Sequence, residues 1–233
     1  MSETRNGIKE WAVIFDCDGV LVDSEPVSLY VLQTVLHQFQ IHASRDELSA
    51  YCGYSDEKTH EALVSRYGEF ARQQQFLAAI NATYMQAIKD EGLPVFSGVR
   101  ELIETLARQR IRYALGSSGP RAKIEASLAI TGLNRVFSVT VSAEDVTHPK
   151  PAPDIFLLCA QRLSVNPSNT VVIEDSLLGI QAAQRAGMAC VAVTNSFPRH
   201  ALAAADLVVD ELSELSVDML EDLACARRDT EGV

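Results

Sequence analysis

Short apolar runs alternate with amphipathic stretches along most of the chain. The runs are rich in Val, Ile and Ala and occupy residues 11–15, 111–116, 136–142, 170–174 and 189–194. Helical periodicity fills the stretches between the later runs, at 123–130, 153–163 and 177–186. This alternation predicts an α/β fold, with a doubly wound, Rossmann-like parallel sheet covered by helices on both faces.

Residues 25–94 interrupt this pattern after the first run. They are almost entirely of helical period and contain no convincing strand. Gly and Pro punctuate the sequence where the segment begins and ends, at 24–26 and 92–98. We therefore predict an α/β core domain made of 1–24 and 95–233, with an all-helical cap subdomain of residues 25–94 inserted into it.

Composition and charge narrow the class of partner. The chain has 233 residues, of which 47% are hydrophobic, so a sizeable buried core is expected. Its formal net charge of −11 argues against nucleic acid or an anionic membrane surface as the partner, because both require a basic face. We expect a small-molecule ligand, and an anionic one only where the surface is locally positive.

Cysteine usage and the N-terminal sequence indicate the compartment. The five cysteines form no CxxC pair, and their number is odd. No basic-then-apolar signal segment opens the chain, and no apolar run approaches the roughly 18 residues that would span a bilayer. We expect a reduced, cytoplasmic protein.

Polar side chains follow four of the apolar runs directly. In open parallel sheets, ligands bind beyond the carboxyl ends of the strands, where the strand order reverses. The residues at those positions are 16–18, 117–119, 143–150 and 174–176. We expect acids, hydroxyls and one lysine to gather at this edge of the sheet.

Asp16 and Asp18 are the first candidates for catalysis. A carboxylate such as Asp16 can attack phosphorus and form an acyl phosphate, which divides one difficult displacement into two easier ones. Asp18, two residues later on an extended segment, points the same way and can protonate the leaving oxygen and then take a proton from water. A plain turn, in which Asp and Gly are common, is the alternative explanation of residues 16–19.

Glu174 and Asp175 would place a second acidic pair beside the first. So many carboxylates require a cation, and Mg²⁺ suits them because it prefers oxygen ligands, keeps several waters and bridges to phosphate. We expect Asp16, the backbone carbonyl of Asp18, and Asp175 to bind it. Capping of a helix by Asp175 or Ser176 is compatible with that role.

Basic and hydroxyl groups at the same edge are the candidates for binding phosphate. Ser117 and the amides of Ser118 and Gly119 stand at the start of a predicted helix, where free N–H groups attract an anion, although a plain helix cap is the alternative. Lys150 lies in a stiff loop between two prolines. Arg121 is a candidate for a substrate carboxylate or hydroxyl, with a solvated arginine as the alternative.

Four motifs in order carry a resemblance to a known family. DCDG, GSSG, HPKPAPD and IEDS resemble the motifs of the haloacid dehalogenase superfamily, and the helical insertion resembles its type 1 cap. DGVLVDSEP and IEDSLLGIQAAQRAG are similar to the branch of β-phosphoglucomutase and sugar-phosphate phosphatases. The resemblance implies that Lys150 offsets the charge of nucleophile and phosphate, that Glu174 acts through water, and that the protein is a monomer.

We therefore expect a Mg²⁺-dependent phosphatase that hydrolyses a sugar phosphate or a phosphogluconate-like compound through an aspartyl-phosphate. A β-phosphoglucomutase-type phosphomutase is the near alternative. Ser28 and Asp56 stand where the resemblance would place the mutase histidine and arginine, which favours hydrolysis. A phosphate-binding module without catalysis is the alternative from a different class. Substrate choice is expected to depend on residues 53–58 and 120–123.

Overall fold

The computed structural model describes residues 9–51 and 54–230, with side chains as far as Arg227. The chain forms two compact units. One contains the segments before Asp23 and after Pro94, and the other is Asp23–Pro94. At the two crossings Val22 pairs with Val95 in an antiparallel bridge, and the Asp23 N–H donates to the Pro94 carbonyl at 2.9 Å.

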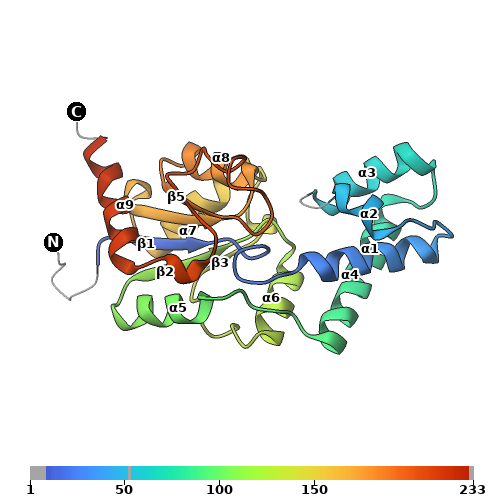
Figure 1. The fold of residues 1–233 in the computed structure, drawn as a ribbon, viewed down its shortest axis with the longest axis horizontal. Coiled ribbons are helices and arrows are strands. Elements are labelled where there is room, and N and C mark those ends of the chain that lie inside the picture. The colour runs from blue at the N-terminus through green and yellow to red at the C-terminus, as the bar shows by residue number, and fades with distance from the viewer. Residues whose placement is uncertain (1–8, 52–53, 231–233) are drawn as a thin grey trace. The chain divides into compact units, whose positions relative to one another are not determined.

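A six-stranded sheet forms the centre of the first unit (Figure 1). Its strand order is β3-β2-β1-β4-β5-β6, and every neighbouring pair is parallel. Since β1 lies between β2 and β4, the carboxyl ends of these three strands are neighbours. The strands are β1 (Ala12–Phe15), β2 (Arg112–Gly116), β3 (Thr140–Val141), β4 (Thr170–Glu174), β5 (Ala189–Val193) and β6 (Leu207–Val209).

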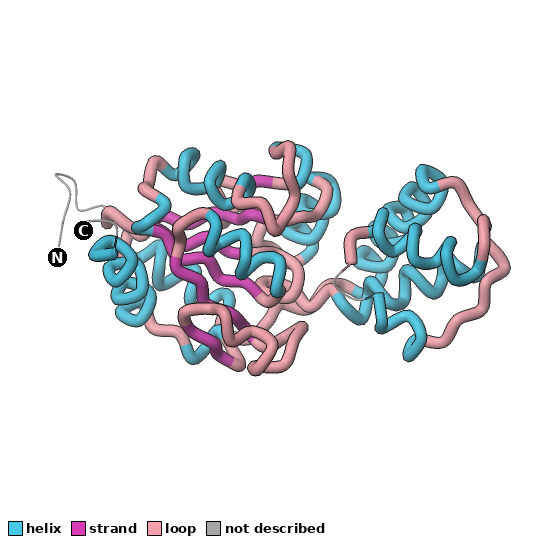
Figure 2. Tube along the Cα trace, turned by 90° about the horizontal axis from the view of Figure 1, so that it is seen from above, coloured by secondary structure: helices cyan, strands magenta, loops and turns pink. Residues whose placement is uncertain are grey.

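Helices pack on both faces of this sheet, as Figure 2 shows from above. Helices α7 and α8 pack on one face, where their apolar side chains and those of the central strands form a continuous buried cluster. Helices α5 and α9 pack against the sheet and against each other. The predicted doubly wound fold is confirmed. The helices of this unit are α5 (Val99–Arg108), α6 (Arg121–Ile130), α7 (Asp154–Leu163), α8 (Leu177–Arg185) and α9 (Val217–Thr230).

Two strands differ from the sequence-based expectation. The apolar run 136–142 contributes only Thr140–Val141 to the sheet, because this edge strand pairs on one side alone, with Leu115 and Gly116. Strand β6, which pairs with β5, was not predicted. Its three residues are too few to produce a recognisable alternation.

Helices are the regular secondary structure of the second unit's described residues. It contains α1 (Glu25–Gln38), α2 (Arg45–Leu48), α3 (Asp56–Tyr67) and α4 (Gln73–Glu91), with a 3₁₀ turn at Ser49–Tyr51. Phe70, Phe76 and the buried His60 pack ring against ring in its interior. None of the helices that the structure describes is long and apolar enough to cross a membrane.

Candidate active site

The candidate residues lie where neighbouring strands end. Asp16 follows β1, Ser117 follows β2 and Asp175 follows β4. The Asp16 N–H continues the ladder by donating to the carbonyl of Ile173 at 3.0 Å. The fold therefore brings together three polar residues that are far apart in the sequence.

Lys150 joins the first and fourth strands through their carboxylates. Its Nζ lies 2.5 Å from Oδ1 of Asp16 and 2.5 Å from Oε1 of Glu174, and its side chain is only 6% exposed. Burial lowers the pKa of Lys150, but the two carboxylates raise it by more, so the ammonium stays charged. The structure thus places Lys150 beside Asp16, the proposed nucleophile.

Glu174 organises the start of α8. Its Oε2 accepts hydrogen bonds from the N–H groups of Asp175 and Ser176 and from the Ser176 hydroxyl, at 2.9 to 3.0 Å. A Cβ on Gly179 would lie 1.8 Å from the Glu174 carboxyl carbon, so glycine is needed at that position. Both carboxylate oxygens of Glu174 are therefore engaged by protein groups, which fits action on a metal through water.

The negative charges of the buried Asp16 and Asp175 carboxylates are offset less completely than that of Glu174. Burial raises the pKa of Asp16 to about 7, opposed by Lys150 and reinforced by Glu174. Burial, with repulsion from Glu174 and Asp16, also raises the pKa of Asp175. Three buried carboxylates thus share one ammonium, and this imbalance suits a bound cation.

The cluster does not form a complete cation cage. Among the described residues, no three His, Cys, Asp or Glu side chains are arranged to hold a metal ion by themselves. Mg²⁺ is commonly held by one or two carboxylates, with waters and substrate phosphate completing the octahedron. The donors available at Asp16, Asp175 and the Asp18 carbonyl fit that pattern.

Asp18 has a neighbour that sequence reasoning missed. Nζ of Lys123, in the first turn of α6, lies 3.6 Å from Oδ2 of Asp18. Oδ1 of Asp18 is buried and accepts no hydrogen bond from the part of the chain that the structure describes. Lys123 belongs to the segment 120–123 that the sequence assigns to substrate choice, and its place in the first helical turn after Ser117–Gly119 was the available signal.

The loop after β2 differs from the expected anion site. The Gly119 N–H donates to Oγ of Ser117 at 3.1 Å, so this amide is not free, contrary to the prediction. Helix α6 begins only at Arg121, whose N–H donates to the Glu144 carboxylate at 3.3 Å. Ser117 is buried and Ser118 is exposed, so the Ser117 hydroxyl and the Ser118 amide remain the candidates for phosphate binding.

Arg121 makes its contacts away from the carboxylate cluster. Its guanidinium lies 2.5 Å from one oxygen of Asp145, whose other oxygen lies 3.1 Å from Arg162. A hydrogen bond from the backbone of Ser142, together with the two arginines, lowers the pKa of Asp145 to about 2. This network, in which Ser142 also donates its hydroxyl at 2.9 Å, ties the loop before Lys150 to the start of α6.

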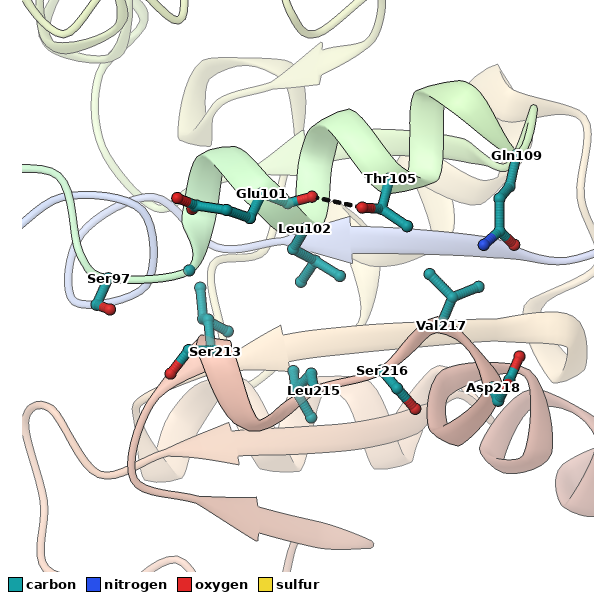
Figure 3. A pocket seen from close by; sticks show the side chains of 12 residues that line it. Ser97, Glu101, Leu102, Thr105, Gln109, Ser213, Leu215, Ser216, Val217 and Asp218 are labelled. Carbon is teal, nitrogen blue, oxygen red and sulfur yellow. Dashed lines mark hydrogen bonds between the residues drawn. The ribbon is translucent and has the colours of Figure 1, made fainter.

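A cleft of about 550 Å³ lies elsewhere in the same unit (Figure 3). It runs between α5 and the segment that leads into α9, and Glu101, Thr105 and Asp218 contribute polar groups. Neither Lys, Arg nor His lines it among the described residues, and two of its side chains are acidic. It is therefore unsuited to a phosphate ester.

The helical unit carries the remaining predicted residues. Ser28 lies on α1, and Asp56 begins α3 behind the capping residue Ser55. Lys58 lies over the ring of Tyr54, 3.9 Å from its centroid. Gly53, the first residue of the predicted specificity segment, lies outside the described residues.

Sequence comparison identifies the family of the chain. The Haloacid dehalogenase-like hydrolase family matches residues 13–193. Fructose-1-phosphate phosphatase YqaB of Escherichia coli (strain K12) is 34% identical over 185 residues, covering 78% of this chain and 95% of that protein. Beta-phosphoglucomutase of Bacillus subtilis (strain 168) is 32% identical over 222 residues, covering 91% and 94%. A longer relative is Protein SUPPRESSOR OF QUENCHING 1, chloroplastic, of Arabidopsis thaliana, which is 32% identical over 215 residues. The match covers 89% of this chain but only 20% of that protein.

A solved structure supports the fold independently. CbbY from Rhodobacter sphaeroides in complex with phosphate superposes with a TM-score of 0.82 over 92% of this chain and all of that one, at 24% identity. At that identity the likeness shows the fold alone. The family match and the two relatives of similar length confirm the resemblance carried by the four motifs. The chain belongs to the haloacid dehalogenase-like hydrolase family.

Proposed function

We propose that the protein is a Mg²⁺-dependent phosphatase that acts on a small phosphomonoester, a sugar phosphate or a phosphogluconate-like compound. The observation that carries the proposal is the Asp16 carboxylate directly after β1, whose Oδ1 is held by Lys150. Ser117 and Asp175 directly follow the neighbouring strands β2 and β4. The two relatives of similar length, a phosphatase and a phosphomutase, act on phosphorylated sugars by their names.

The reaction begins with attack by Asp16 on phosphorus. Because Lys150 holds Oδ1, the second oxygen, Oδ2, is the one available to form the new O–P bond. The ester P–O bond breaks, and Asp18 transfers its proton to the leaving oxygen, so the alcohol departs neutral. Ser117 binds a phosphoryl oxygen through its hydroxyl.

Hydrolysis of the aspartyl-phosphate completes the cycle. Asp18, now ionised, takes a proton from a water molecule that attacks phosphorus, and the bond to Asp16 breaks with release of inorganic phosphate. Lys150 offsets the negative charge on Asp16 and on the phosphoryl group throughout. When bound by Asp16, Asp175 and the carbonyl of Asp18, with Glu174 acting through water, Mg²⁺ would offset the same charge and orient the phosphoryl group.

The proposal is tested by measuring phosphate release over a panel of sugar phosphates, phosphogluconate and glycerol phosphate, with Mg²⁺ and with EDTA. We expect release with Mg²⁺ that EDTA abolishes and that Asp16→Asn removes. A brief reaction quenched in acid should add one phosphoryl mass to the peptide that contains Asp16. An Asp16→Asn variant with wild-type rates on an aryl phosphate would exclude the mechanism.

A phosphomutase is the second candidate, because Beta-phosphoglucomutase of Bacillus subtilis matches over most of both chains. Ser28 and Asp56 stand in place of the histidine and arginine of the mutase resemblance, and this favours hydrolysis. If a coupled assay shows that the protein converts β-glucose 1-phosphate to glucose 6-phosphate faster than it releases phosphate, the phosphomutase becomes the preferred function. Background release with every substrate would favour a phosphate-binding module.

A further inference from the structure

The loop after β5 reaches the active-site cluster from a fifth strand. Asn195 donates its side-chain amide to the carbonyl of Gly19 at 2.7 Å. The hydroxyl of Ser196 donates to Oδ2 of Asp175. Two adjacent residues therefore hold two separate parts of the site, the turn after Asp18 and the carboxylate after β4.

Asp175 is confined between this loop and the turn. Gly19 has a left-handed backbone with φ of 80°, and a Cβ there would lie 1.9 Å from Oδ2 of Asp175 and 3.0 Å from Oγ of Ser196. The carboxylate fills the space that a side chain at position 19 would need. Its position is thus set by the glycine on one side and by the Ser196 hydroxyl on the other.

The Ser196 hydroxyl stabilises the Asp175 carboxylate, which lies in an unfavourable electrostatic environment. Asp175 is buried beside Glu174 and Asp16, and both of these carboxylates repel it. Since Ser196 donates to Oδ2, Oδ1 is left to meet a cation. Groups that hydrogen-bond to metal ligands in this way orient them and typically change metal affinity by about 10- to 100-fold.

We propose that Ser196 is a positioning residue for metal binding, which holds the Asp175 carboxylate so that Oδ1 faces the Mg²⁺ ion, while Asn195 anchors the loop on Gly19. This inference rests on the proposed function, because it assigns Asp175 to the metal. Ser196 itself is exposed, so loss of its hydroxyl leaves no cavity in the core.

Ser196→Ala removes the hydroxyl, and Ser196→Thr retains it. The matched control is Ser213→Ala, because the Ser213 hydroxyl also donates to a carboxylate, that of Glu211, at 3.0 Å on an exposed segment. Mg²⁺ affinity of the full chain is measured by calorimetry without substrate, and thermal stability is measured in EDTA.

We expect Ser196→Ala to weaken Mg²⁺ binding by about 10-fold or more, with Ser196→Thr and Ser213→Ala close to wild type. In EDTA each variant should unfold in a single cooperative transition, that of Ser196→Ala at a lower temperature because it has lost a hydrogen bond to a buried carboxylate. Wild-type affinity in Ser196→Ala, or an equally weakened affinity in Ser196→Thr, would overturn the inference while the phosphatase proposal stands. Absence of Mg²⁺ binding by the wild-type protein would overturn both.

Discussion

The ammonium of Lys150 lies 2.5 Å from a carboxylate oxygen of Asp16, and both side chains are at most 10% exposed. Replacing Lys150 by Met leaves the Asp16 and Glu174 carboxylates buried without their shared cation. Removing one partner of such a buried pair costs about 3–5 kcal/mol. We expect Lys150→Met to lower the free energy of unfolding by that amount in urea titrations, and to abolish turnover.

The matched control for this change is Lys9→Met. Lys9 pairs with Glu221 at 3.0 Å, but both side chains are more than a fifth exposed. Exposed pairs contribute at most about 1 kcal/mol, so the loss should be small. Equal losses in the two variants would contradict the view that burial makes the Lys150 pair critical.

The raised pKa of Asp16 predicts how stability depends on pH without metal. Burial raises this pKa from 3.8 to about 7, so the folded protein holds the proton more tightly than the unfolded chain does. Stability should therefore fall as pH rises from about 4 to about 7, by up to roughly 4 kcal/mol. Asp16→Asn removes this contribution, and its stability should fall less over the same range.

The measurement is urea unfolding of both proteins in EDTA at several pH values across that range. Mg²⁺ added at the high end should restore stability to the wild-type protein more than to Asp16→Asn. Parallel pH profiles for the two proteins would show that Asp16 ionises normally in the folded state.

Gly179 provides a test of how Glu174 is packed. Its substitution by Ala forces the buried Glu174 carboxylate to move and should cost about 1–3 kcal/mol. In a Glu174→Ala background the obstacle is gone, and the same substitution should be neutral or stabilising by up to about 1 kcal/mol, because Ala favours helix over Gly. A double-mutant cycle measured by urea unfolding tests this change of sign, and equal effects in the two backgrounds would refute it.

Arg121 and Arg162 allow the substrate role of Arg121 to be separated from its structural role. The two side chains are 40% and 39% exposed, and each pairs with one oxygen of Asp145. If Arg121 only holds this network, Arg121→Met and Arg162→Met should each lower stability by about 1 kcal/mol or less and leave KM unchanged. A KM that rises in Arg121→Met but not in Arg162→Met would show that Arg121 binds the substrate.

The convergence of acids and lysine was predictable from sequence, because the strand ends of a parallel sheet meet at one edge. By that rule Asp16, Ser117 and Asp175 follow β1, β2 and β4, and Lys150, in the loop after β3, contacts Asp16. It also applies to the fifth run, after which Asn195 and Ser196 stand, but a lone amide and hydroxyl carry less chemical signal than paired acids. Their roles become visible only through their contacts with Gly19 and Asp175.

Other features depend on distant pairings that no local pattern reports. Arg121 pairs with Asp145, 24 positions further along, and its N–H, at the start of the helix where an anion was expected, donates to Glu144. The competition between an acidic side chain of the protein and an incoming phosphate is decided by how two loops pack. Sequence periodicity describes each loop by itself and cannot show that competition.

The strand order has a consequence for synthesis on the ribosome. Strand β1 pairs only with β2 and β4, so the apolar segment that carries Asp16 has no partner until Arg112–Gly116 has been made. At about 5–20 residues per second, that interval lasts roughly 5–20 s. The whole of Asp23–Pro94, which forms a compact unit, emerges meanwhile. Folding of this unit would bring Val22 and Val95 together. Strand β1 would then have less conformational space to search before it pairs with β2 in the nascent core.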